Sequence, residues 1–371
     1  MSGVGSLPVS DITGSLGTYS LSGFGTGSYT VTPSKTGDPG NGLNTFDAAR
    51  VAQHVVGPPL PVLTGNQLIV ADVSGNGTIT SFDAGLIADF VVQLPPFGLT
   101  GTWRFNPVNR TYPAVTSNIS GEDYSALLMG EVSGDWTSEI PGRSAINSGP
   151  EQSASVKLPQ LVTPSDSEVV IPVSVQRAAN KGIIAYEFVL RYDPLVIQPQ
   201  ADLIEISGTV SERLSAVANA KEPGLIRVAV YGATPIDGSG ILMNLRFTAV
   251  GTPGSVSPIT WERFMFNDGA SRTMVIDGQV ELSAAAPNQA EISGRLLNPM
   301  GQGIANALVT LTDSTGKARF AISNETGVYR FGGLNVGQTY TVSVKSIRHH
   351  FAPLTISVTS QLVNMNMIAD Q

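Results

Sequence analysis

A twelve-residue polar loop followed at once by a helical pattern constrains the fold of this chain more than any other feature. Residues 72–83 read Asp-Val-Ser-Gly-Asn-Gly-Thr-Ile-Thr-Ser-Phe-Asp. Calcium loops of this length place oxygen ligands at positions one, three, five, seven, nine and twelve, with a glycine at position six for the sharp turn. Gly77 holds the sixth position, and the predicted ligands are Asp72, Ser74, Asn76, Thr78 through its carbonyl, Thr80 and Asp83. The alternative is a polar turn that only caps the following helix.

The loop and its helix belong to the second of two copies. Residues 45–52 match residues 81–88, and in both copies the apolar positions recur at helical spacing. This spacing predicts two short amphipathic helices that pack together. The stretch before the first helix is shorter and less regular, and its candidate ligands are Asp38, Asn41, Asn44 and Asp47. A turn without metal is the alternative for this first loop.

Charge and cysteine content limit the partners and the compartment. The net charge is −8, which disfavours a phosphate-binding surface, so nucleic acid is not an expected partner. The absence of cysteine removes disulfides, thiol nucleophiles and thiolate metal sites. No apolar run approaches the ~18 residues that a membrane span requires. Because calcium outside cells would fill weak loops, we expect an extracellular or cell-surface protein with Ca²⁺ as its cofactor.

The sequence carries no recognisable catalytic motif. It has no Gly-Xaa-Ser-Xaa-Gly elbow, no phosphate-binding loop and no zinc signature. We therefore expect a protein that is not an enzyme.

Strand patterns dominate the second half of the chain. Residues 155–283 contain eight or nine apolar strand patterns separated by turns, which favours a two-sheet jelly-roll sandwich. Residues 291–370 contain about seven more, enough for a second sandwich. Before these strands, residues 122–129 predict a third short helix, and residues 131–135 copy the first half of a calcium loop, most simply as a turn.

The N-terminal segment repeats part of the C-terminal strands. Residues 17–31 match residues 327–342, and both read as a strand, a glycine turn and another strand. The first copy stands almost alone, and a few strands cannot bury a hydrophobic face by themselves. We therefore expect strands of another polypeptide to cover an open edge around residues 19–24 and 28–32. The apolar side chains at this edge are Tyr19, Leu21, Phe24, Tyr29 and Val31.

The duplicated loop and helix over residues 36–94 resemble the dockerin module. The resemblance implies a small calcium-dependent domain that binds a partner through the residue pair just before each closing aspartate. These pairs are Thr45-Phe46 and Ser81-Phe82. An exposed phenylalanine in both copies would be costly in an unbound protein, so we expect both rings to be packed.

Two further resemblances concern the strand-rich regions. Residues 155–283 resemble the cohesin domain, the partner of dockerins, through the stretches 184–194, 224–229 and 240–247. Residues 288–371 resemble a carboxypeptidase-regulatory or collagen-adhesin B-type repeat, which implies a prealbumin-like sandwich. Together they are typical of a bacterial extracellular modular protein.

The predicted fold is mainly β, with multidomain β-sandwiches, a cohesin-like jelly roll and a prealbumin-like sandwich, and a small helical calcium module. The predicted domains are 1–35, partial B-type strands; 36–140, the dockerin-like module with an extension; 141–154, a linker; 155–285, the cohesin-like sandwich; and 286–371, the B-type sandwich. This organisation predicts a structural subunit that joins copies of itself head to tail, through strand complementation and dockerin/cohesin-like contacts. The alternative is a scaffold or adhesin fragment that recruits other dockerin- or cohesin-bearing proteins.

Overall fold

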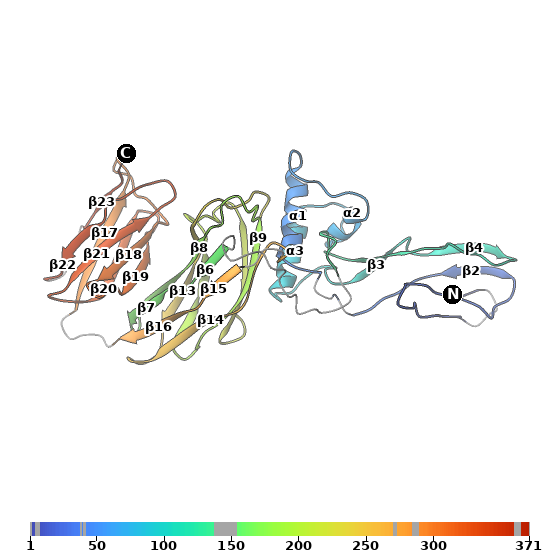
Figure 1. Cartoon of the computed structure of the whole chain (residues 1–371), viewed down its shortest axis with the longest axis horizontal. Coiled ribbons are helices and arrows are strands. Elements are labelled where there is room, and N and C mark those ends of the chain that lie inside the picture. The colour runs from blue at the N-terminus through green and yellow to red at the C-terminus, as the bar shows by residue number, and fades with distance from the viewer. Residues whose placement is uncertain are drawn as a thin grey trace.

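The chain forms a long body with four parts in a row (Figure 1). The computed structural model describes residues 2–3, 8–37, 39, 42–136, 154–269, 273–283, 289–359 and 365–370. From the C-terminal end, the parts are a second sandwich, a first sandwich, a helical module and an extended β arm. The predicted mainly β, multidomain architecture is confirmed. No described helix is long and apolar enough to cross a membrane.

The helical module consists of α1 (Thr45–Val56), α2 (Asn66–Ala71) and α3 (Ser81–Val91). Helices α1 and α3 begin in the same way. Asn44 and Thr80 accept the amides of Phe46 and Phe82, while Asp47 and Asp83 accept the amides of the two cap residues. Such a capping box satisfies two donors that a helix start would leave unpaired. Small and apolar residues on the facing sides of α1 and α3 form the buried core of the module, including Ala48, Ala49, Val51, Ala84, Ile87 and Ala88.

The β arm combines the N-terminal segment with a segment that leaves the helical module and returns to it. Its strands are β1 (Ser2–Gly3), β2 (Gly27–Val31), β3 (Trp103–Asn106), β4 (Arg110–Val115) and β5 (Ser125–Leu128). β3 pairs with β5, and the remaining strands form a sheet in the order β1-β2-β4. The arm therefore joins residues that are far apart in the sequence, such as Tyr29 and Tyr112.

Three expectations for the arm are wrong. The helix predicted around residues 122–129 is instead strand β5, because a short apolar run fits either structure and pairing with β3 decides between them. The strand predicted at residues 17–24 is absent, because no strand among the described residues pairs with this segment. The open edge expected at residues 28–32 is also absent, because β1 and β4 of the same chain flank β2.

The first sandwich has two sheets with a shared apolar core. One sheet has the order β10-β13-β8-β6-β15, and it faces the strands β11-β12-β9-β14-β16-β7. Its strands are β6 (Ala154–Lys157), β7 (Gln160–Pro164), β8 (Glu168–Gln176), β9 (Ala185–Arg191), β10 (Ile197–Glu205), β11 (Ser215–Asn219), β12 (Leu225–Tyr231), β13 (Gly240–Ala249), β14 (Val256–Phe266), β15 (Thr273–Ile276) and β16 (Gly278–Ser283). The predicted linker before this sandwich lies outside the described residues over 141–153.

The second sandwich contains the seven strands that the sequence predicts. Its strands are β17 (Gln289–Leu297), β18 (Leu308–Asp313), β19 (Ala318–Ile322), β20 (Val328–Asn335), β21 (Thr339–Lys345), β22 (Leu354–Ser357) and β23 (Met367–Ile368). The sheet β20-β17-β23 faces β19-β18-β21-β22 across a core that includes Tyr329, Phe331 and Val342.

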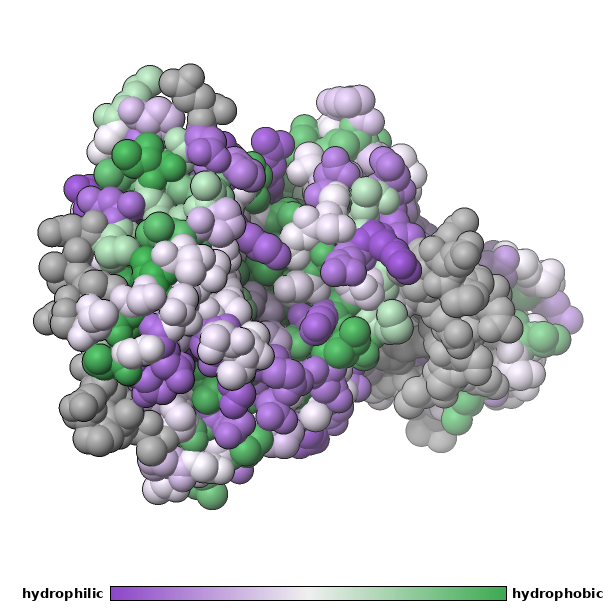
Figure 2. All heavy atoms as spheres, turned by 60° about the vertical axis from the view of Figure 1, so that its left-hand side comes forward, coloured by the Kyte–Doolittle hydropathy of each residue, from purple (hydrophilic) through white to green (hydrophobic). Residues whose placement is uncertain are grey.

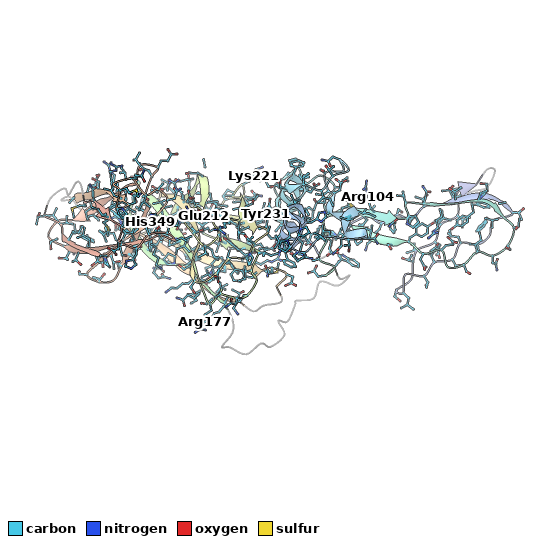
Figure 3. The ribbon with its side chains drawn as sticks, turned by 90° about the horizontal axis from the view of Figure 1, so that it is seen from above. Arg104, Arg177, Glu212, Lys221, Tyr231 and His349 are labelled. Atoms are coloured by element: carbon cyan, nitrogen blue, oxygen red, sulfur yellow. The ribbon has the colours of Figure 1, made fainter. Side chains whose placement is uncertain are left out.

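The two sandwiches share one continuous sheet. Ala318 on β19 pairs in parallel with Leu161 on β7, so ten strands run from β11 to β22. Near this joint, the guanidinium of Arg348 lies 2.8 Å from a carboxylate oxygen of Glu212, and Figure 3 shows Glu212 and His349 close to each other. In the view of Figure 2, hydrophobic residues lie in small separated groups among hydrophilic ones.

Candidate functional site

The helical module lies against the sheet of the first sandwich that contains β9 and β12 (Figure 1). The two parts share a single buried cluster. Ile184, Ala185, Ala229 and Tyr231 of the sandwich are buried together with the small and apolar residues of α1 and α3. Tyr231 is seen between the two parts in Figure 3. The interface is therefore a packed core and not a set of surface contacts.

Glu187 on β9 is the central polar group of this interface. The backbone amide and the hydroxyl of Thr45 donate to its Oε2 at 2.9 and 2.7 Å. Its other oxygen lies 2.8 Å from the guanidinium of Arg263, and the side chain of Glu187 is only 5% exposed. A buried carboxylate needs both hydrogen bonds and an opposite charge. Here the helical module supplies the hydrogen bonds and the sandwich supplies the charge.

A second set of hydrogen bonds fixes the C-terminal end of α3. The side-chain amide of Asn219 donates to the carbonyls of Val92 at 2.9 Å and Gln93 at 3.1 Å. Carbonyls at the end of a helix have no partner within the helix, so this amide satisfies groups that docking would otherwise bury unpaired. The side chain of Gln53 on α1 also donates to the carbonyl of Ala233, at 3.2 Å. The module is thus held at several separate positions.

The two predicted binding pairs have different surroundings. Thr45 is buried at the contact with the first sandwich, and Phe46 packs partly buried against the core of the module. Ser81 and Phe82 face away, and Phe82 is 61% exposed, so the expectation that both phenylalanines are packed is wrong for Phe82. The contact predicted between neighbouring chains is made within one chain.

Sequence reasoning missed the receiving side of the contact, although one signal was present. Glu187 is a single charged residue inside the apolar run of residues 183–190. A buried charge in such a strand requires a partner, which points to an interface.

The predicted calcium loop folds so that its first and last ligands approach each other. The carboxylate of Asp72 accepts the amides of Asn76 at 3.1 Å and Gly77 at 2.9 Å. The amide of Ser74 donates to Asp83 at 2.9 Å. Gly77 has φ of 84°, a value that favours glycine. The loop thus has the glycine turn of the calcium-loop pattern, and both of its carboxylates accept amides from within the loop.

The remaining predicted ligands of this loop also make local hydrogen bonds. The amide of Thr78 donates to the side-chain oxygen of Asn76 at 2.8 Å, and Thr80 donates to Asp83 through both its amide and its hydroxyl. These bonds are equally compatible with a capped polar turn.

The closing residue of the first copy meets a different segment from the one predicted. Asp38 and Asn41 lie outside the described residues, and Asn44 caps α1. Asp47 is fully buried, and its Oδ1 accepts the amides of Val132 and Ser133, both at 3.0 Å. The half loop of residues 131–135, predicted as an isolated turn, therefore packs against the start of α1.

This discontinuous pair repeats the hydrogen-bonding scheme of residues 72–83. Glu131 accepts the hydroxyl of Ser133 at 3.0 Å and the amide of Asp135 at 3.2 Å, as Asp72 accepts from Ser74 and Asn76. The amide of Ser133 donates to Asp47, just as that of Ser74 donates to Asp83. The first copy of the loop is thus split between two distant parts of the sequence.

The closing carboxylate of the split loop is buried. This burial, together with the nearby negative charge of Glu131, raises the pKa of Asp47 to about 8. Among the described residues, no three or more Asp, Glu or His side chains gather as a metal cluster. A cation at either loop would therefore depend on hydroxyl, amide and carbonyl oxygens as well as on carboxylates.

Two family models match the sandwiches. Residues 154–282 match the cohesin domain, and residues 291–365 match the carboxypeptidase regulatory-like domain. These matches confirm the two resemblances drawn from the strand-rich regions. No curated protein matches the chain.

Solved structures of cohesins resemble about a third of the chain. A non-cellulosomal cohesin from Archaeoglobus fulgidus is 19% identical, with a TM-score of 0.31, over 36% of this chain and 92% of that chain. A chain of a type I cohesin–dockerin complex from Clostridium thermocellum is 19% identical, with a TM-score of 0.31, over 35% of this chain and 99% of that one. The seventh ScaB type I cohesin from Pseudobacteroides cellulosolvens is 18% identical, with a TM-score of 0.32, over 36% and 95%.

Proposed function

We propose that this chain is a rigid structural subunit of an extracellular assembly, in which the first sandwich holds a dockerin-like helical module of the same chain. The contact of Thr45 with Glu187 carries this proposal. Both matched families are non-catalytic binding modules, which agrees with a protein that is not an enzyme. The cohesin match supports a role in protein–protein interaction. Here one such interaction is satisfied internally.

Internal docking gives the subunit stiffness. The packed cluster around Tyr231 joins the helical module to the first sandwich, and the shared ten-stranded sheet joins the first sandwich to the second. Domains that meet through small polar contacts move relative to each other, whereas packed apolar interfaces restrain them. A stiff, elongated body suits a subunit whose copies join head to tail through their ends. A scaffold that recruits other dockerin-like modules would first have to release its own.

Calcium is part of this proposal, because the donor atoms fit it. Residues 72–83 provide two carboxylates, hydroxyls and an amide oxygen around a glycine turn. Asp47 and Glu131 provide two carboxylates, and Ser133 provides a hydroxyl, at the split loop. When bound, calcium would supply positive charge that offsets the carboxylates at each loop. At the split loop, it would also tie residues 131–135 to the start of α1.

The split loop predicts the calcium stoichiometry. We expect isothermal titration calorimetry to show two calcium ions per wild-type chain and one per Glu131→Gln chain, because the substitution removes a charged ligand from one loop only. The control is Glu325→Gln, at an exposed glutamate on a turn of the second sandwich. This variant should still bind two calcium ions per chain. Two ions bound by the Glu131→Gln chain would exclude the split loop as a calcium site.

Electron microscopy of the purified chain tests the assembly. We expect elongated head-to-tail particles in millimolar calcium and shorter or more flexible particles after chelation. Single particles one chain long, under both conditions and at all concentrations, would contradict assembly of copies. Internal docking would then be retained only if the helical module still protects the β9 and β12 face from hydrogen exchange.

A further inference from the structure

The β arm contains a groove that the proposed function does not use. The groove has a volume of about 900 Å³ and lies between residues 16–26 and residues 115–123. The hydroxyl of Tyr19 donates to the carbonyl of Glu122 at 2.6 Å and so connects its two sides. Tyr19 is 37% exposed, and Tyr112 also lines the groove. A groove of this size, lined by polar groups together with Tyr19, Phe24 and Tyr112, suits an extended peptide segment, whose backbone is polar.

One side of the groove carries unused backbone groups. Residues 21–24 belong to neither a helix nor a strand. In the described part of the chain, their backbone amides and carbonyls make no hydrogen bond. The neighbouring strand β2, in contrast, is paired on both edges. Unpaired backbone next to a groove is the feature that strand addition uses, because main-chain hydrogen bonds supply affinity and side-chain pockets supply specificity.

The internal repeat shows which kind of strand covers these residues. Residues 17–24 correspond to residues 327–334. In the second sandwich, these residues form β20, which pairs antiparallel with β17, with Phe331 opposite Ile292 and Tyr329 opposite Gly294. Tyr329 and Phe331 are only 1% and 2% exposed there. The arm has the counterpart of β20 but, among its described residues, no counterpart of β17 beside it.

We propose that the groove of the β arm binds a β17-type strand of a different protein, antiparallel to residues 21–24. The expected strand has the pattern of β17, in which Ala290, Ile292, Gly294 and Leu296 alternate with more polar residues. Its glycine would lie opposite Tyr19, as Gly294 lies opposite Tyr329. The β17 strand of a folded second copy is not free to supply it, because it is the middle strand of the sheet β20-β17-β23. The inference goes beyond the proposed function, since it names a partner other than a copy of this chain.

The test uses a fluorescent peptide with the sequence of residues 289–297, Gln-Ala-Glu-Ile-Ser-Gly-Arg-Leu-Leu, and the full-length chain. We expect saturable binding by fluorescence anisotropy, together with slower hydrogen exchange at the amides of residues 21–24. A peptide with aspartate in place of the residue that corresponds to Ile292 should bind at least tenfold more weakly. Absence of saturable binding, or equal binding of the two peptides, would overturn the proposal.

Two variants of the chain locate the site. Ser22→Pro removes a backbone donor from the free segment without changing an apolar side chain, and we expect at least tenfold weaker binding. Ile12→Asp changes a residue that is 92% exposed and does not line the groove, and it should bind as the wild type does. Circular dichroism checks that both variants fold. Equal affinity of Ser22→Pro and wild type would place the peptide elsewhere and contradict the proposal, whatever the assembly state seen by microscopy.

Discussion

Replacing Glu187 with alanine is expected to release the helical module from the first sandwich. The substitution leaves the amide and hydroxyl of Thr45 without their acceptor and leaves Arg263 without its counter-charge. Arg263 is 56% exposed and can be solvated by water, so the main cost is the loss of a buried acceptor for Thr45, about 1–3 kcal/mol. We expect that loss to appear in the docking equilibrium, because Glu187 touches both parts.

Hydrogen exchange and small-angle scattering measure this release. The amides of β9 and β12 that face α1 should exchange faster, and the radius of gyration should rise. The matched control is Glu262→Ala, whose carboxylate pairs with Arg191 at 3.1 Å on the exposed surface of the same sandwich. Surface pairs contribute about 0–1 kcal/mol, so this variant should stay docked. Unchanged exchange in the Glu187→Ala chain would show that the apolar contacts alone hold the module, and the docking role of Glu187 would be wrong.

Loss of Asp72 is expected to reduce the stabilisation of the chain by calcium strongly, because the loop of residues 72–83 loses a charged ligand while the split loop keeps its own. A ligand that binds only the folded state stabilises it by about 3–4 kcal/mol at 100 to 1,000 times its dissociation constant. Asp72→Ala removes the carboxylate that meets the amides of Asn76 and Gly77. Calcium should therefore raise the midpoint temperature of thermal unfolding in the wild type, and should raise it much less in this variant.

Asp83→Ala separates metal binding from helix capping. Asp83 also accepts the amides of Ser74 and Thr80, so its loss should lower stability even in a chelator. Asp72→Ala should lower stability mainly in calcium. The control Asp237→Ala, at an exposed turn of the first sandwich, should keep the full calcium effect. An undiminished calcium effect in both Asp72→Ala and Asp83→Ala would contradict the assignment of residues 72–83 as a calcium loop.

Local sequence patterns predicted most of the helices and strands in which a periodic pattern continues over many residues or the flanking turns have specific residues. The seven strands of the second sandwich and helices α1 and α3 are examples, since alternation or helical spacing extends over many residues there. Strand β5 was mistaken for a helix because its apolar run is short. Residues 17–24 have the same alternation as β20 but form no strand, because alternation alone does not show whether a partner strand lies beside them.

The contacts that form the candidate site could not be read from local patterns. Asp47 was assigned to the loop just before it, yet it meets residues 131–135. Thr45 was identified from its position before the closing aspartate, but its acceptor Glu187 lies in another domain. Such pairs depend on how whole elements pack, and one sequence contains no direct record of that packing.

The continuous sheet across both sandwiches also has a geometric consequence. Neighbouring strands are rotated relative to each other with a constant hand. The joint between β7 and β19, at the pair Ala318 and Leu161, places both sandwiches in this strand series, so the second sandwich continues the rotation of the first. If identical copies stack end to end, the same contact repeats and turns each copy by the same increment, so the resulting fibril would have a defined helical pitch.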